Sequence, residues 1–170
     1  MKFSTVFTIL AVAVISVTAD FPSLKSEIGQ IQASVSGLHN ALVKTAGTSY
    51  AEGLQMDQAA KKLGKDLDAA ATSARSVKTV SRVEAQAVLK GLEGSYHQVS
   101  IISARLVALK PAWSKLGVAA VAKADLAMLA GSTRAFGKEM VAIAPAPLKS
   151  SAAKLADKYN AAMTKALDAY

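Results

Sequence analysis

The side chains that could carry out chemistry are few in this sequence and lie far apart. Its histidines are His39 and His97, and neither has another histidine or a carboxylate at the spacing of a metal site. Cysteine is absent, so there is no thiol nucleophile, and no Gly-x-Ser-x-Gly segment offers a nucleophilic serine. We therefore expect a protein that is not an enzyme and that holds no metal and no cofactor.

Two polar residues interrupt otherwise apolar helical stripes, which makes them candidates for contact with a ligand. The hydroxyls of Ser95 and Thr133 can each donate a hydrogen bond to a carbonyl one turn earlier in the same helix. Alternatively, one of them meets the polar head group of a lipid. Gly91 and Gly94 belong to the same segment as Ser95, and they indicate either a close helix crossing or space for an acyl chain.

The elements that must position these residues are five segments in which apolar residues recur in steps of three and four. This spacing places the apolar side chains on one face of an α-helix, and no segment has the alternation of a β-strand. The five apolar stripes run from Leu24 to Leu42, Met56 to Val77, Ala85 to Leu109, Ala122 to Ile143 and Leu148 to Tyr170.

Local signals predict the ends of the first two helices. Ser23, which follows Phe21-Pro22, is the expected N-cap of the first helix, because a serine side chain can accept from a free backbone amide. Gly47 is expected to end that helix, and Thr48 is expected to cap the second.

The third helix has the clearest boundaries in the sequence. Ser81 and Glu84 have the spacing of a capping box, and Pro111 is expected to stop the helix. Trp113 then falls in the longest break, residues 110–117. It either caps the end of the bundle, lies at the mouth of a cavity or touches an apolar surface.

Five amphipathic helices with short connections predict an all-α fold, an antiparallel bundle that forms a single domain over residues 20–170. The stripes are rich in alanine, which permits either a tight interior or one that contains a cavity. Residues 1–19 have the features of a signal peptide: Lys2, an apolar run from Val6 to Val17 and small residues before Asp20. We therefore expect a secreted, extracellular mature chain without a transmembrane segment.

The charge of the chain limits its partners. Its net charge is +8, and without Lys2 the remainder has 19 basic and 12 acidic residues, a net charge of +7. This charge favours anionic surfaces or ligands, but scattered basic residues and few aromatic ones exclude nucleic acid as a partner. We interpret the acidic residues as a solvated shell on the helices, and they include Glu27, Glu52, Asp66, Asp68, Glu93 and Asp125.

Four segments resemble the fungal hydrophobic surface-binding protein A family, which includes the cell wall galactomannoproteins. They are Ile28-Gly29-Gln30-Ile31 through Leu38, Leu106 to Trp113, Leu126-Ala127-Met128-Leu129 and the final Ala166 to Tyr170. The resemblance implies a secreted helical bundle whose apolar interior takes fatty acids or other lipids. It also implies adsorption to hydrophobic surfaces and recruitment of secreted lipolytic or polyester-degrading enzymes. The chain lacks a Ser/Thr-rich stalk and an apolar C-terminal tail, so we expect a free protein, although cell-wall association fits the family.

These observations lead to one hypothesis for the interior, with two alternatives. We expect an acyl chain between the helix of residues 82–110 and that of residues 118–144, with Gly91, Gly94 and Ala130 leaving space beside it. The alternatives are a protein that adsorbs to surfaces through its helix stripes and a structural cell-wall protein. The expected ligand-binding residues are Leu92, Val99, Ile102, Leu129, Phe136 and Met140, with Ser95 or Thr133 near the polar end.

Overall fold

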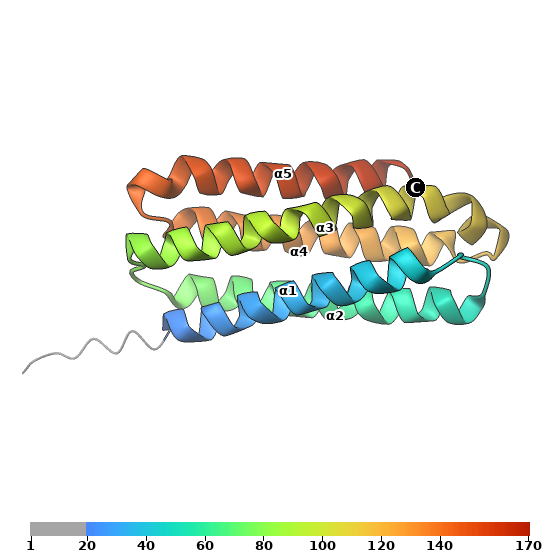
Figure 1. Ribbon diagram of the computed structural model, residues 1–170, viewed down its shortest axis with the longest axis horizontal. Coiled ribbons are helices and arrows are strands. Elements are labelled where there is room, and N and C mark those ends of the chain that lie inside the picture. The colour runs from blue at the N-terminus through green and yellow to red at the C-terminus, as the bar shows by residue number, and fades with distance from the viewer. Residues whose placement is uncertain (1–19) are drawn as a thin grey trace, which may run out of the picture.

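The structure, a computed structural model, describes residues 20–170, and within them it contains helices and no strand (Figure 1). The all-α bundle predicted from the sequence is therefore confirmed, whereas the predicted signal peptide, residues 1–19, lies outside the described residues. No helix in the described part is long and apolar enough to cross a membrane. The elements are α1 (Asp20–Lys44), α2 (Tyr50–Ser76), α3 (Arg82–Lys115), α4 (Ala119–Ile143), the 3₁₀ turn η1 (Ala146–Leu148) and α5 (Lys149–Asp168).

The five α-helices form a closed ring in which each packs mainly against two others. The order around the ring is α1, α2, α4, α5, α3 and back to α1. Consecutive helices run in opposite directions, as Figure 1 shows, so the bundle is antiparallel along the chain. In the ring, however, α2 lies parallel to α4, and α3 lies parallel to both α1 and α5. The connections from α2 to α3 and from α3 to α4 therefore cross between helices that are not neighbours.

A ring of five helices leaves a space along its axis. With neighbouring helix axes about 9 Å apart, the centres of five helices lie about 8 Å from the common axis. A helix with its side chains has a radius of about 5 to 6 Å, so only the inward-facing side chains reach the middle. The apolar stripes of all five helices point there, and this convergence explains the buried core.

Capping boxes begin both α3 and α2, and the sequence predicts the first of them correctly and misplaces the second. The capping box of α3 is confirmed, because Ser81 accepts from the amide of Glu84 and the Glu84 carboxylate accepts from the amide of Ser81. The expected cap at Thr48 is wrong by one residue. Ser49 caps α2 instead, because its position places Glu52 where a carboxylate can complete a second capping box.

The start of α1 also differs from the prediction. The helix begins at Asp20, so Ser23 lies within its first turn and is not the N-cap. Pro22 is compatible with this position, because the first amides of a helix have no intrahelical acceptor and the missing N–H of proline costs nothing there.

Pro111 does not stop α3, which continues to Lys115. The proline removes one backbone hydrogen bond, but continuing the helix beyond it buries Trp113, which is only 3% exposed. The helix ends after a further turn in a Schellman motif. Gly117 adopts a left-handed φ of 75°, its amide donates to the carbonyl of Ser114, and the amide of Val118 donates to the carbonyl of Trp113.

Trp113 packs beneath the loop between α1 and α2, at the end of the bundle. Gly47 in this loop has a φ of 69°, and a Cβ atom there would lie 2.7 Å from Leu109 Cδ2 and 3.2 Å from Trp113 Nε1. Arg105 holds the same loop, because its guanidinium donates to the carbonyls of Leu42 and Thr45. Gly47 is therefore required both by its backbone conformation and by the space available.

Gly47 and Gly117 both have a left-handed backbone conformation, but only Gly47 lies in a confined space, so the two glycines distinguish backbone strain from steric clash. Gly117→Ala introduces backbone strain alone, since no atom lies within 4 Å of its Cβ position, and we expect it to lower the free energy of unfolding by about 1 kcal/mol. Gly47→Ala adds a clash with Leu109, so we expect a loss of about 2 to 3 kcal/mol. Urea unfolding of the two variants measures the difference, and equal losses would contradict the packing described here.

Candidate ligand-binding cavity

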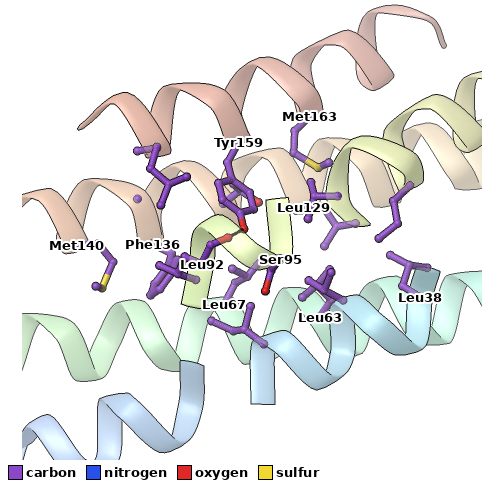
Figure 2. Close-up of a pocket in the computed structure, with 18 of the residues that line it drawn as sticks. Leu38, Leu63, Leu67, Leu92, Ser95, Leu129, Phe136, Met140, Tyr159 and Met163 are labelled. Carbon is purple, nitrogen blue, oxygen red and sulfur yellow. Dashed lines mark hydrogen bonds between the residues drawn. The ribbon is translucent and has the colours of Figure 1, made fainter. Parts of the chain in front are cut away.

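A cavity of about 70 Å³ lies on the axis of the ring, and all five helices contribute to its wall. Figure 2 shows leucines of α1 and α2 facing side chains of α3, α4 and α5 across it. No charged side chain of residues 20–170 lines the cavity. Its polar lining consists of the hydroxyl groups of Ser95, Thr133 and Tyr159.

The eight residues proposed from the sequence all line this cavity, although their role in binding stays a prediction. They are Leu92, Ser95, Val99 and Ile102 on α3 and Leu129, Thr133, Phe136 and Met140 on α4. The cavity is not confined to the space between α3 and α4, because these two helices are not neighbours in the ring. α5 lies on one side of the space between them, and α1 and α2 close the other side.

Sequence reasoning missed the residues that the other three helices supply. Leu38 of α1, Leu63 and Leu67 of α2, and Tyr159 and Met163 of α5 lie around the same space (Figure 2). The signal for them was present, because each continues the apolar stripe of its helix. Only the ring order shows that these stripes share one cavity with the stripes of α3 and α4.

The hydroxyl groups of the cavity differ in their hydrogen bonding. Ser95 Oγ donates to the carbonyl oxygen of Gly91 at 3.2 Å, which is the local bond expected from the helix. The Thr133 side chain makes no hydrogen bond to another described residue. Thr133 is therefore better placed than Ser95 to donate to a ligand oxygen, since its hydroxyl gives up no protein partner.

Tyr159 joins α5 to α3 at the wall of the cavity. Its hydroxyl donates to the carbonyl of Leu92 at 2.6 Å, and its ring packs edge-on against Tyr96 with the centroids 5.4 Å apart. Burial, together with the neighbouring Tyr96, raises the pKa of the Tyr159 phenol far above its ordinary value. The hydroxyl therefore remains a hydrogen-bond donor throughout the physiological pH range.

The small residues expected to leave space for a ligand lie elsewhere. Gly94 is exposed and has nothing within 4 Å of its Cβ position, and neither Gly94 nor Ala130 lines the cavity. Gly91 faces Gln32 of α1, whose Nε2 lies 2.9 Å from the Cβ position, so this glycine permits a close helix crossing. The glycine in the cavity wall is Gly137, which packs closely against Ala156 of α5.

The histidines take no part in the cavity. His97 is exposed, and His39 is half-buried with its Nδ1 atom 3.4 Å from Asn40 Oδ1. In the described part of the chain, no three histidine, cysteine, aspartate or glutamate side chains come together as they would around a metal ion.

The fold and the cavity define a class of protein, an α-helical ring around an apolar interior. The sequence profile of one family, described as hydrophobic surface binding protein A, matches residues 21–142. The match covers well over half of the chain, and the chain belongs to this family. No curated protein matches the sequence.

Solved structures share the fold at low sequence identity. Ligand-binding domain 1 of the Penicillium marneffei MP1 protein, complexed with arachidonic acids, is 18% identical, with a TM-score of 0.81 over 88% of this chain and 97% of that one. AFMP4P in complex with palmitic acid is 22% identical, with a TM-score of 0.82 over 88% of this chain and 98% of that one. Domain 2 of MP1, complexed with multiple arachidonic acids, is 16% identical, with a TM-score of 0.80 over 87% and 94% of the two chains.

Two partly buried phenols, those of Tyr159 and Tyr170, make the free energy of unfolding depend on alkaline pH. Burial raises the pKa of Tyr170 to about 12, and its hydroxyl donates to the carbonyl of Leu106, as Tyr159 does to Leu92. In the unfolded chain both phenols ionise near pH 10. In the folded chain both phenols still hold their protons at that pH, because their pKa values are raised. The free energy of unfolding must therefore fall as the pH rises above about 10.

We expect Tyr159→Phe and Tyr170→Phe each to reduce this alkaline loss of stability, and each to lower stability at neutral pH by about 1 kcal/mol through a lost hydrogen bond. Tyr50→Phe is the matched control, because Tyr50 is 69% exposed and should leave the pH dependence unchanged. Urea unfolding between about pH 8 and pH 11 measures the effect. The same pH dependence in all four proteins would refute the burial of these phenols.

Proposed function

We propose that the protein binds a fatty acid or a similar lipid, with the acyl chain in the central cavity. The observation that carries this proposal is the lining, which is apolar, comes from all five helices and contains no charged side chain. Each methylene group transferred from water into such surroundings contributes about 0.8 kcal/mol. The structures with the same fold that hold palmitic or arachidonic acid support this choice of ligand.

The cavity must widen to accept a long acyl chain. Its volume of about 70 Å³ is small for a long-chain fatty acid. Met140 and Met163 line it, and methionine side chains adapt readily to a new neighbour. Because α3 and α4 are not packed against each other, their separation would disrupt few contacts.

The protein would make few stabilising contacts with the carboxylate of the ligand. Thr133 offers one hydroxyl, and no cationic side chain of residues 20–170 lines the cavity. We infer that affinity comes mainly from the length of the acyl chain and that selectivity among head groups is weak. We also infer that the protein is exported and acts without catalysis, as its family and the apolar cavity suggest.

A second candidate function is adsorption to hydrophobic surfaces. Tyr50, Leu54 and Val121 are exposed apolar residues, between 49% and 69% accessible, and they line the opening of a second cavity. Val43 is also exposed, at 54%, near the loop that precedes Tyr50. An apolar group at one end of the bundle would allow the protein to adsorb without opening.

Two neighbouring residues of α3 test the site of lipid binding. We expect Ser95→Trp to fill the cavity and to lower the affinity for palmitic acid more than tenfold, measured by calorimetry at equal protein concentration. Gly94→Trp places the same side chain on the outside and should leave the affinity unchanged. Circular dichroism is the control for folding, and we expect it to show that both variants remain helical.

Equal palmitic acid affinities in the wild type and Ser95→Trp would place the ligand outside this cavity. If the wild type shows no saturable uptake, yet both it and Ser95→Trp adsorb to neutral hydrophobic beads, adsorption replaces lipid carriage as the function.

The hydroxyl groups provide a finer test of head-group contact. Thr133→Val removes the available donor and retains the shape of the side chain, so we expect palmitic acid affinity to fall about fivefold, the value of one modest hydrogen bond. Ser95→Ala is the control, because the Ser95 hydroxyl already bonds to Gly91 and its removal should change the affinity little. A larger effect at Ser95 than at Thr133 would reverse this assignment.

A further inference from the structure

A second cavity, of about 180 Å³, lies at the end of the bundle where the loops from α1 to α2 and from α3 to α4 meet. It is lined by α1, α2, α3 and α4 and by no residue of α5. Leu38, Leu106 and Leu129 line both this cavity and the central one, so the two cavities are adjacent and share these three side chains.

The second cavity differs from the central one in carrying charge. The carboxyl groups of Asp57 and Asp125 line it, which corrects the interpretation of Asp125 as part of a solvated shell. The Asp57 side chain is only 13% exposed and pairs with Lys61 Nζ at 2.6 Å. Asp125 makes no hydrogen bond or salt bridge to another described residue. Two carboxylates and one ammonium leave one negative charge at the wall of this cavity.

Aromatic side chains complete the lining. Trp113 and Tyr50 both contribute to the wall, and the faces of aromatic rings attract cations. Trp113 is 3% exposed, and its Nε1 atom is buried without a hydrogen-bond partner in the described chain. This nitrogen lies under Gly47 of the loop between α1 and α2, so the indole offers a bound cation its ring and not its N–H.

We propose that the second cavity binds the ammonium head group of a single-chain aliphatic amine, with Asp125 as its counter-ion. The amine would donate to the unpaired carboxylate and lie against the aromatic walls, and its tail would pass the three leucines into the central cavity. A fatty acid fits this end poorly, because its carboxylate would face two others.

The opening of the cavity suits such an amphiphile. Tyr50, Leu54 and Val121 are exposed apolar residues that line it, so an aliphatic chain can first contact this end of the bundle. The chain as a whole carries a net charge of +8, which repels cations in general. Attraction of an amine therefore has to come from the local carboxylates, and a single substitution can test it.

The experiment compares dodecylamine, dodecanol and dodecanoate, which have tails of equal length, on the full folded chain. We expect Asp125→Asn to weaken dodecylamine binding about tenfold and to leave dodecanol unchanged. Asp68→Asn is the matched control, since Asp68 is an exposed carboxylate of α2 that lines neither cavity, and its loss removes the same charge. Calorimetry below the micelle concentration of each ligand gives the affinities.

The pH dependence provides a second readout that a merely structural role of Asp125 would not change. Burial, and then repulsion from Asp57 reduced by Lys61, raise the pKa of Asp125 to about 6. Dodecylamine affinity should therefore fall as the pH drops through about 6, while the amine stays charged. This decrease should be absent in Asp125→Asn and for dodecanol.

The outcomes separate this inference from the proposed function, which concerns the central cavity. Dodecanoate binding without dodecylamine binding would overturn the inference and leave fatty acid binding intact. Equal effects of Asp125→Asn and Asp68→Asn, or equal affinity for amine and alcohol, would also overturn it. Dodecylamine binding that depends on Asp125 without dodecanoate binding would support the inference and count against the fatty acid.

Discussion

Closure of the helical ring is what removes the apolar faces of the five helices from water. Each α-helix packs mainly against two neighbours, so no helix can bury its apolar stripe against a single partner. The five stripes are buried only together, around the axis that they share. The core and the cavity therefore have one origin, since the side chains that hold the bundle together are those that line its interior.

Polar contacts join neighbouring helices of this ring, and one of them, from Ser103, is buried. Ser36 bonds to Gln98 between α1 and α3, Ser103 bonds to the Ala162 carbonyl between α3 and α5, and Arg75 pairs with Glu139 between α2 and α4. These hydrogen bonds and this salt bridge favour particular pairs of neighbouring helices, while each adds only modest stability. Apolar side chains in the interior can therefore replace a contact with each other by a contact with an acyl chain. A lipid-binding site requires this property.

The two cavities differ because α5 is shorter than its neighbours. α5 ends at Asp168, and Tyr170 bonds to the carbonyl of Leu106, whereas α3 continues to Lys115. On the far side of Leu106 the second cavity is therefore surrounded by four helices, whereas the central cavity is surrounded by five. Asp57 and Asp125 line the second cavity. Helix α3 continues past Pro111 because the burial of Trp113 outweighs the backbone hydrogen bond that the proline cannot make.

Hydrophobic periodicity alone specifies the helices and the side of each helix that faces inward. A period of 3.6 residues fixes a buried face without reference to any partner, so Leu92, Phe136 and the other proposed residues of α3 and α4 could be placed at the cavity. The flank of each helix that meets a neighbour follows instead from the packing order of the ring. Gly94 therefore proved to be outside and Asp125 at a cavity wall, because the ring order joins segments that no local pattern relates.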